Sequence, residues 1–223
     1  MSGYEVVHID ELESFPVDEE GLTWRPVRRR FDIRAFGVNA YTADREGQRV
    51  VEEHRESGGH QELYVVIAGR ATFTLDGEEH DAPAGTLIHC PPDTLRSAFA
   101  AEPGTTILGI GAKPGEVFQP SGWEWTFAAF TLLKQGDLER ARAEMEAGIA
   151  ERPNDWQGHY NFACLEARAG DTDAALRHLA RAAELDPGEV ARLAKNDEDF
   201  ATISKDERFL AIAGQAEPPG AGA

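Results

Sequence analysis

The sequence has few cysteines and no long apolar run, and both absences narrow the class of protein. Its two cysteines, Cys90 and Cys164, lie in segments of different character, so a disulfide framework is not expected. No stretch approaches the roughly 18 apolar residues of a membrane-spanning helix. The first ten residues lack the basic and apolar regions of a signal peptide. We therefore expect a soluble, cytoplasmic protein that does not bind membranes.

Positive charge is also scarce. The 223 residues include 22 Lys and Arg against 40 Asp and Glu, for a formal net charge of −18. An acidic surface repels phosphate backbones, so nucleic acid is not expected as a partner. The sequence also lacks the G-x-S-x-G, P-loop, G-x-G-x-x-G and C-x-x-C motifs of common nucleophile, nucleotide and redox sites.

Up to about Pro120 the sequence is divided into short β-branched and aromatic segments separated by glycine and proline. This pattern is typical of an antiparallel sandwich or small barrel. Asp76-Gly77 predicts a tight hairpin, and the Ser-Gly-Gly after Glu56 predicts another over residues 49–64. We interpret Arg28-Arg-Arg30 as an exposed strand edge. Strands are predicted at 49–55, 62–68, 71–75, 86–90 and 105–110, with edge strands added by the first forty residues.

From Trp125 onward the apolar period becomes helical and the sequence repeats itself at a spacing of 34 residues. A 34-residue period with glycine between two helices and proline after the second resembles the tetratricopeptide repeat, over roughly residues 122–187. The resemblance implies a peptide or protein partner, because stacked helix pairs present a concave groove. The matched positions are Gly136-Asp137 with Gly170-Asp171, Ala141 with Ala175, and Pro153 with Pro187.

The segment after the two repeats is expected to complete the packing of the helices. We predict a short helix near residues 189–196, and we assign Phe200 and Phe209 to the core. His159 and His178 lie on repeat helices without a second ligand in register, so we interpret them as structural. The predicted domains are therefore a β-barrel over 1–118, a helical domain over 119–214 and a disordered tail over 215–223.

Histidines and carboxylates gather in the segment 49–64. His54 and Glu56 are two residues apart, as are His60 and Glu62, so each pair shares one face of an extended strand. If both faces point inward, four nitrogen and oxygen donors converge, a set that suits Fe, Mn, Ni, Cu or Zn. A solvated hairpin end is the alternative for His60 and Glu62, and we interpret Glu56 as a charge beside the turn.

The same region resembles the cupin superfamily. Glu62 and Gly69 keep the spacing of the second half of the first cupin motif, and Gly85 and Pro91 keep that of the second motif. The departures are the five residues between His54 and His60, and Asp93, Arg96 and Ala100 in place of the second motif's Gly, His and Asn. The resemblance covers roughly residues 47–100. It implies a double-stranded β-helix (jelly-roll) barrel, a homodimer and a divalent metal.

Arg96 stands where the resemblance implies the fourth metal ligand, a histidine. A guanidinium stays charged and cannot coordinate a cation. Arg96 is suited instead to holding the carboxylate or phosphate of a small anionic ligand, with Tyr64 as a second contact, or to pairing with Glu62 or Glu56. His89 on the preceding strand is the candidate for the vacant ligand position, and a hydrogen-bonded core histidine is the alternative.

Three functions from different classes remain open. The first is a barrel that binds a small molecule or metal without turnover, joined to a helical protein-interaction domain. The second is a metal-dependent enzyme of dioxygenase or isomerase type, with His54, His60, Glu62 and His89 as ligands. The third is a structural or assembly protein with a vestigial pocket. The arginine at the ligand position favours the first, and the sequence leaves open whether the protein is an enzyme.

Overall fold

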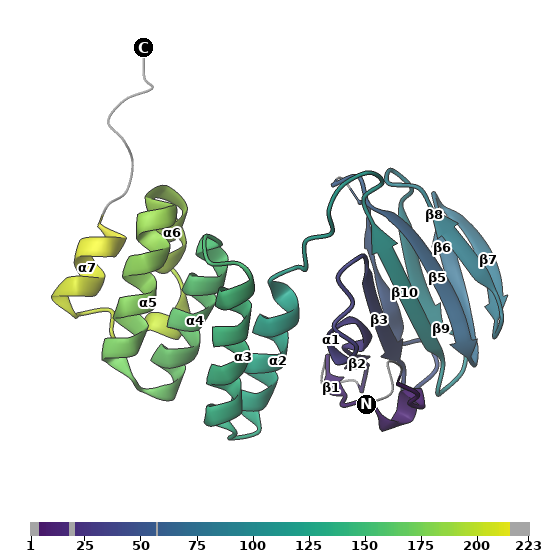
Figure 1. The fold of residues 1–223 in the computed structure, drawn as a ribbon, viewed down its shortest axis with the longest axis horizontal. Helices are drawn as coiled ribbons and strands as arrows, with labels where there is room; N and C mark the ends of the chain where they lie inside the picture. Colours follow the sequence, from purple (N-terminus) through teal and green to yellow (C-terminus); the bar gives the residue numbers. More distant parts are fainter. Residues whose placement is uncertain (1–4, 18–20, 57, 215–223) are drawn as a thin grey trace, which may run out of the picture. The chain divides into compact units, whose positions relative to one another are not determined.

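The computed structural model describes residues 5–17, 21–56 and 58–214, and the chain divides into two units, Met1–Pro120 and Ser121–Ala223 (Figure 1). The predicted boundary lies two residues before this division. The tail predicted over 215–223 lies outside the described residues. Among the described residues, no helix is both long and apolar enough to cross a membrane.

The first unit is a sandwich of two antiparallel sheets. The six-stranded sheet has the order β1-β2-β3-β10-β5-β8, and the four-stranded sheet has the order β4-β9-β6-β7. The strands of the first sheet are β1 (Phe15–Pro16), β2 (Thr23–Arg25), β3 (Gly37–Thr42), β10 (Thr106–Ala112), β5 (Gln61–Ala68) and β8 (Leu87–Cys90). Those of the second are β4 (Arg49–His54), β9 (Arg96–Ala100), β6 (Arg70–Leu75) and β7 (Glu78–Pro83). A short 3-10 helix, η1 (Ile9–Glu11), precedes β1.

The core of the sandwich lies between the two sheets and follows the period-two alternation of the strands. Along β5, Tyr64 and Val66 point inward and are buried, as are Ala71 and Phe73 along β6. The rings of Tyr64 and Phe73 lie 5.7 Å apart across the interior, within the range of favourable aromatic contacts. The strands predicted at 49–55, 62–68, 71–75, 86–90 and 105–110 are confirmed to within one or two residues at each end.

The hairpin predicted over residues 49–64 is wrong. β4 pairs with β9 in one sheet, whereas β5 pairs with β10 and β8 in the other. The described residues 55–56 and 58–60 therefore belong to a segment that crosses from one sheet to the other. Because of this crossing, His54 at the end of β4 and Glu62 at the start of β5 approach from opposite layers of the sandwich.

Two sharp turns explain why glycine is required where the motifs place it. Asp76 and Gly77 both have positive φ, +48° and +91°, which is the two-residue hairpin turn predicted between β6 and β7. Gly69, between β5 and β6, has φ +70°, and a Cβ there would lie 2.6 Å from the Thr105 hydroxyl oxygen. Only glycine fits at position 69, because both its backbone angle and its surroundings exclude a side chain.

The basic triplet at 28–30 does not form the predicted strand edge. It lies in α1 (Val27–Arg30), a single helical turn that packs against β3. Arg28 is buried, and its guanidinium donates to the carbonyl of Ile33 at 3.5 Å. The arginine side chain therefore contributes to packing through its aliphatic stem rather than presenting a free positive patch.

The second unit is entirely helical among its described residues, and it keeps the 34-residue period of the sequence. α5 begins and ends 34 residues after α3, and Gly136 and Gly170, which precede these helices, have φ of +83° and +84°. α2 packs against α3, and α4 packs against α5. The elements are α2 (Trp123–Lys134), α3 (Leu138–Glu151), α4 (Trp156–Ala169), α5 (Thr172–Leu185), α6 (Pro187–Ala194), η2 (Glu198–Phe200) and α7 (Glu207–Ala213).

Aspartates cap the helices after α2. Each accepts a hydrogen bond from a backbone N–H of the first turn, which satisfies a group that has no partner inside the helix. The capping residues are Asp137, Asp155, Asp171, Asp186, Asp197 and Asp206. Part of the acidic composition of the chain is therefore structural.

The C-terminal segment supplies apolar side chains to the core of the helical unit, as predicted. Phe200 is buried and packs edge-on against Tyr160, with the ring centroids 5.5 Å apart, and Phe209 lies 5.6 Å from Phe200. The predicted short helix is α6.

α3 and α4 are joined by a bidentate pair in which Arg142 Nε and Nη2 donate to the buried Glu166 at 2.8 and 2.6 Å.

The helical unit should lose stability as the pH falls through the titration range of histidine. The His178 ring stacks on Phe162 at 4.0 Å and lies 6.0 Å from His159, with Glu166 and Arg177 as the other charged neighbours. Burial and His159 lower the pKa of His178 below its ordinary value of 6.5. The unfolded chain therefore takes up the proton first, so stability is complete above about pH 6.5 and declines below it.

Thermal unfolding followed by circular dichroism at pH 7.5 and pH 5.5 checks this expectation. The midpoint should fall at the lower pH in the native sequence, and the fall should be smaller in the His178→Gln variant. An equal fall in both proteins would show that His178 does not account for the acid sensitivity.

Candidate functional site

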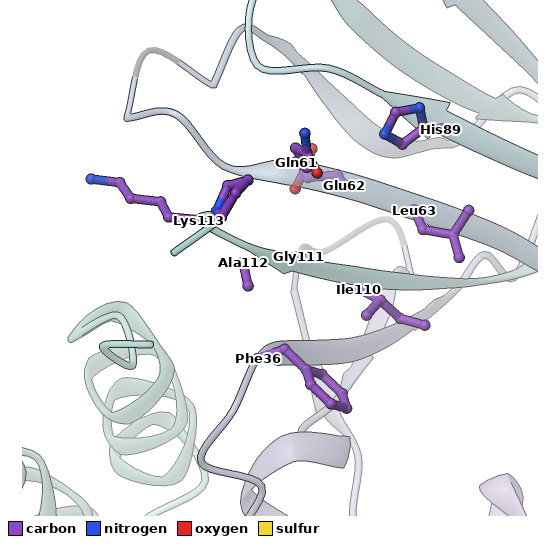
Figure 2. Close-up of a pocket in the computed structure, with 10 residues that line it drawn as sticks. Phe36, Gln61, Glu62, Leu63, His89, Ile110, Gly111, Ala112 and Lys113 are labelled. Atoms are coloured by element: carbon purple, nitrogen blue, oxygen red, sulfur yellow. The ribbon is translucent and has the colours of Figure 1, made fainter. Parts of the chain in front are cut away.

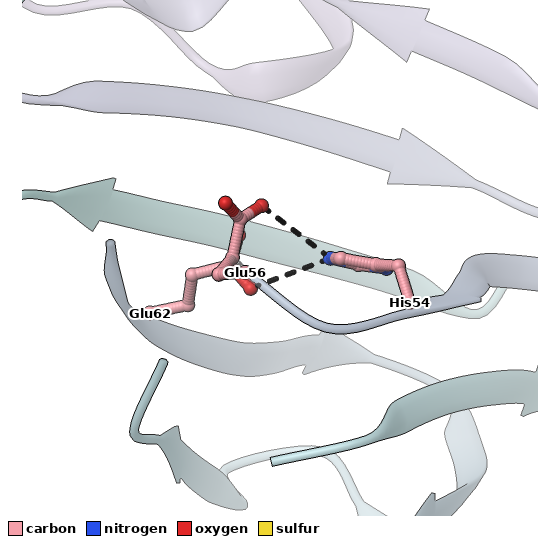
Figure 3. Close-up of side chains that lie close together, drawn as sticks. All are labelled: His54, Glu56 and Glu62. Atoms are coloured by element: carbon pink, nitrogen blue, oxygen red, sulfur yellow. Dashed lines mark ion pairs between the residues drawn. The ribbon is translucent and has the colours of Figure 1, made fainter. Parts of the chain in front are cut away.

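The imidazole of His54 and the carboxylates of Glu56 and Glu62 meet at one end of the sandwich (Figure 3). His54 Nε2 lies 3.6 Å from Glu56 Oε1 and 3.7 Å from Glu62 Oε2. One donor atom from each of the three residues lies within 4.8 Å of the other two. The three side chains are partly exposed, so the cluster is open to solvent.

The orientation of His54 is fixed by its other ring nitrogen. Nδ1 lies 2.8 Å from the backbone carbonyl of Glu52. A carbonyl only accepts hydrogen bonds, so Nδ1 carries a proton, and Nε2 is the ring nitrogen that faces the two carboxylates. This arrangement, with one nitrogen donating to a carbonyl and the other facing the site, is the one that metal-binding histidines adopt.

Glu62 is the most heavily contacted member of the cluster. The hydroxyl of Tyr64 donates to Glu62 Oε2 at 2.6 Å, and Arg96 Nη2 lies 3.0 Å from the same oxygen. Burial, together with the Glu62 carboxylate, raises the pKa of Tyr64 far above its ordinary value. The phenol therefore remains protonated and continues to donate its hydrogen bond, which holds the carboxylate in place.

Arg96 lies beneath the cluster and is fully buried, with 0% of its side chain exposed. Its Nη1 donates to the carbonyls of Thr94 and His54 at 2.9 and 3.4 Å. Although Nη2 lies close to Glu62, neither Nη2 nor Nε has a hydrogen-bond partner of suitable angle among the described residues. The Arg96–Glu62 contact is therefore an attraction between charges rather than a formed hydrogen bond.

Glu56 connects the cluster to His60. His60 Nδ1 lies 3.3 Å from Glu56 Oε2, so the carboxylate lies between two imidazoles. The backbone N–H of Glu56 donates to the carbonyl of Pro92 at 3.0 Å, which fixes the crossing segment against the loop after β8. The sequence favours a charge beside a turn for Glu56, whereas the structure places its carboxylate in the cluster. Its two-residue spacing from His54 was the available signal for a role in the site.

The structure does not bring His89 to this cluster. In the pairing of β5 with β8, Glu62 is opposite Cys90 and Leu63 is opposite His89. Side chains of directly paired residues lie on the same side of a sheet. Glu62 and Cys90 therefore face the interior, whereas His89 faces outward with Leu63 and is exposed. Of the predicted site residues, His54, Glu62, Tyr64 and Arg96 come together, and His60 joins them through Glu56.

The two facing antiparallel sheets define the N-terminal unit as a jelly-roll sandwich. Residues 43–106 match the family model described as the Cupin domain. The match contains β4 to β9 and the first residue of β10, together with His54, Glu56, Glu62 and Arg96. The helical unit lies outside it. No curated protein matches the chain.

Solved structures similar to the chain include KdgF from a Halomonas species, at 19% identity over 49% of this chain and 93% of that one, with a TM-score of 0.39. A cupin protein from Bacteroides fragilis shares 19% identity over 54% and 93% of the two chains, with a TM-score of 0.39. A sugar phosphate isomerase of the cupin superfamily from Silicibacter pomeroyi shares 16% identity over 49% and 76%, with a TM-score of 0.42.

Both cysteines should be unreactive in the folded protein. Cys90 lies beside Arg96 with its side chain fully buried, and Cys164 is buried against Asp197. Burial raises the pKa of both thiols above the ordinary value, and Arg96 opposes the effect at Cys90 only in part. The reactive species is the thiolate, so neither residue should react at pH 8.

Titration with a chromogenic disulfide reagent measures this directly. We expect no rapidly reacting thiol in the native protein and two in denaturant. Rapid reaction of one thiol in the native state, abolished in Cys90→Ala, would show that the interior beside Arg96 is open to small molecules.

Proposed function

We propose that the N-terminal sandwich binds a divalent cation through His54, Glu56 and Glu62, without turnover, and that the helical unit joins this module to a protein partner. The observation that carries the proposal is the convergence of His54 Nε2, at the end of β4, with the carboxylates of Glu56 in the crossing segment and Glu62 on β5. Imidazole nitrogen and carboxylate oxygen suit Fe, Mn, Ni, Cu or Zn.

The separations of His54 Nε2 from Glu56 Oε1 and Glu62 Oε2 fit a divalent cation of this kind. At metal–ligand distances of about 2.1 Å, donors 3.6 Å apart subtend about 120° at the cation. Small side-chain rotations bring this angle to tetrahedral or octahedral values. Tyr64 donates to Glu62 Oε2, and the carbonyl of Glu52 accepts from His54 Nδ1, so both ligands are already oriented by a neighbour.

Arg96 supports the site by holding Glu62 and weakens it by its charge. With neutral imidazoles, two carboxylates and one guanidinium give the cluster a formal charge of −1, which attracts a cation less strongly than two carboxylates alone. We place a cation ahead of the small anionic ligand predicted for Arg96, because the guanidinium is fully buried and already faces Glu62. An anion reaching it would have to displace that carboxylate.

A bound divalent cation would act as a Lewis acid with positions open to a further ligand. The chain supplies only three donors, because Arg96 stands where the cupin resemblance implies a fourth ligand. The remaining positions on the cation would be open to a substrate, so a metal-dependent enzyme of dioxygenase or isomerase type is the second candidate. This candidate depends on the same ion and fails with it.

The helical unit supports the second half of the proposal. Its two helix hairpins repeat at 34 residues, with positive-φ glycines and capping aspartates at matching positions, as in tetratricopeptide-like repeats. Arrays of this kind bind peptides and proteins along their stacked helices. We therefore propose that this unit makes the protein contact and that the sandwich holds the ion.

Elemental analysis of the full chain, purified without a chelating tag, tests the cation site. We expect near-stoichiometric metal, or its recovery on dialysis against Mn²⁺ or Zn²⁺. The His54→Ala and Glu56→Gln variants should bind the ion more weakly by at least about 10- to 100-fold, the loss found even when a partner of a ligand is removed. Titration calorimetry with each ion gives the ratio.

The matched control is His80→Ala, which removes an exposed imidazole from the edge strand β7 and should leave binding unchanged. A metal-free protein that takes up neither ion would overturn the proposal and leave a purely structural sandwich. Equal loss in the His80→Ala variant would assign the ion to nonspecific surface binding.

Arg96→Gln should strengthen cation binding. A unit charge about 5 Å from a divalent ion opposes it by about 7 kcal/mol at an effective dielectric constant of about 20 and by about 2 kcal/mol at that of bulk water. The cluster is partly exposed, so the effect lies toward the lower of these two values. We expect a gain of between about 10- and 100-fold, measured by calorimetry with Zn²⁺. The control is Arg70→Gln, which removes an exposed arginine paired with Asp81. Unchanged affinity in Arg96→Gln, with the fold intact by circular dichroism, would place the ion away from Glu62.

A further inference from the structure

Two of the three donors in the cluster are each held by one neighbouring group. The Glu52 carbonyl accepts a hydrogen bond from His54 Nδ1, and the Tyr64 hydroxyl donates one to Glu62 Oε2. Glu56 is the third donor, and it lies beyond the end of β4, in the segment that crosses between the sheets. Its side chain is 28% exposed, so neither strand pairing nor close packing fixes the direction of its carboxylate.

His60 contacts the second oxygen of the Glu56 carboxylate. His60 Nδ1 lies 3.3 Å from Glu56 Oε2, whereas His54 Nε2 lies 3.6 Å from Glu56 Oε1. A carboxylate only accepts hydrogen bonds, so His60 Nδ1 is the donor in this contact. The two oxygens of Glu56 therefore face different imidazoles, and the bond to His60 leaves Oε1 directed at the cluster.

A tight turn brings His60 back beside Glu56. The backbone N–H of Gly59 donates to the Glu56 carbonyl at 3.1 Å, and the Glu56 N–H donates to the Pro92 carbonyl at 3.0 Å. Gly59 has φ +84°, a backbone conformation that residues with a side chain rarely adopt. The glycines that the sequence favours as the turn of a hairpin thus place an imidazole against the carboxylate four residues before it.

His60 is not placed to bind the same ion as the cluster. Two donors that each lie about 2.1 Å from one cation are at most about 4.2 Å apart. His54, Glu56 and Glu62 each offer a donor atom within 4.8 Å of the other two, and His60 does not belong to this group. Its contact is with a ligand of the ion rather than with the position of the ion.

We infer that His60 is a positioning residue of the cation site, which holds the Glu56 carboxylate and does not itself coordinate the ion. The inference rests on the cation site proposed above. Each of the three donors then has one orienting partner, and the partner of Glu56 is the imidazole of His60. A carboxylate that is held in advance loses less side-chain freedom when the ion binds, so the partner strengthens binding without touching the ion.

Calorimetric titration of the full chain with Zn²⁺ tests this role. The His60→Ala variant should bind the ion about 10- to 100-fold more weakly than the native sequence. The His60→Asn variant keeps a side-chain N–H donor near the place of Nδ1, so it should recover most of the affinity. The His60 side chain is 36% exposed, so neither substitution should change the thermal midpoint of the metal-free protein.

Loading with Cu²⁺ distinguishes a ligand from a positioning residue, because imidazole is a good ligand for this ion and gives a nitrogen signature in electron paramagnetic resonance. We expect one coordinated imidazole in the native chain and also in the His60→Ala variant. The His54→Ala variant should show none. A second imidazole in the native chain that is lost in His60→Ala would overturn the inference and make His60 a ligand.

The matched control is His89→Ala. His89 is exposed and faces outward on β8, where it lines a surface pocket with residues that include Leu63, Glu62 and Lys113 (Figure 2). The control thus removes an imidazole at the same end of the sheet as Glu62 but from the face opposite the cluster. Its affinity for Zn²⁺ should equal that of the native chain.

The remaining outcomes separate this inference from the proposed function. A native chain that binds neither Zn²⁺ nor Cu²⁺ would overturn the cation site, and the role of His60 with it. If the native chain binds Zn²⁺ and His60→Ala binds it equally well, the cation site stands and His60 has no part in it. An equal loss of affinity in His60→Ala and His60→Asn would show that the N–H donor at this position does not act on Glu56.

Discussion

The guanidinium of Arg96, buried between two sheets, is the constraint on which the open end of the sandwich depends. A charge without solvent requires an opposite charge close by, and Glu62 provides it from the facing sheet. Once Glu62 is held there by Arg96 and Tyr64, the end of β4 brings His54 to it, and the crossing segment adds Glu56. The buried Arg96 therefore sets the positions of the cluster, although a guanidinium cannot itself coordinate a metal.

The division into a β unit and a helical unit could be predicted from sequence because each depends on local periodicity. Alternating apolar residues and the Asp76-Gly77 turn fixed most of the strands, and the 34-residue repeat fixed the helices. The hairpin predicted over 49–64 was wrong because the sheet that a strand joins depends on its contacts with strands distant in the sequence. The same turn residues that close a hairpin also allow the chain to cross between layers, and no residue in the segment distinguishes the two outcomes. The prediction of an exposed strand edge at residues 28–30 was wrong for a related reason, because Arg28 is buried where its helix packs on β3.

Motif spacing was enough to predict some residues of the candidate site. It could not predict the residues whose orientation depends on the pairing register of the strands. Glu62, Gly69 and Arg96 follow from the cupin resemblance, and the structure brings Glu62 and Arg96 together. His89 and Cys90 are neighbours in sequence on opposite sides of β8, and only the pairing of Glu62 with Cys90 shows which one faces inward. Glu56 lies beyond the end of β4, where strand alternation no longer applies. Its position is fixed by the hydrogen bond to the Pro92 carbonyl, which sequence does not reveal.

The aspartate caps and the 34-residue period together make the helical unit modular. α5 ends at Leu185 and the next residue, Asp186, caps α6, whereas Asp155 caps α4 four residues after α3 ends at Glu151. The aromatic residues that close the core, Phe200 and Phe209, all follow this junction. A copy of the 34 residues 152–185 inserted after Leu185 would end in a second copy of α5, so Asp186 and α6 would again follow directly. The junction is the point at which gene duplication or design can lengthen the array while its C-terminal end remains closed.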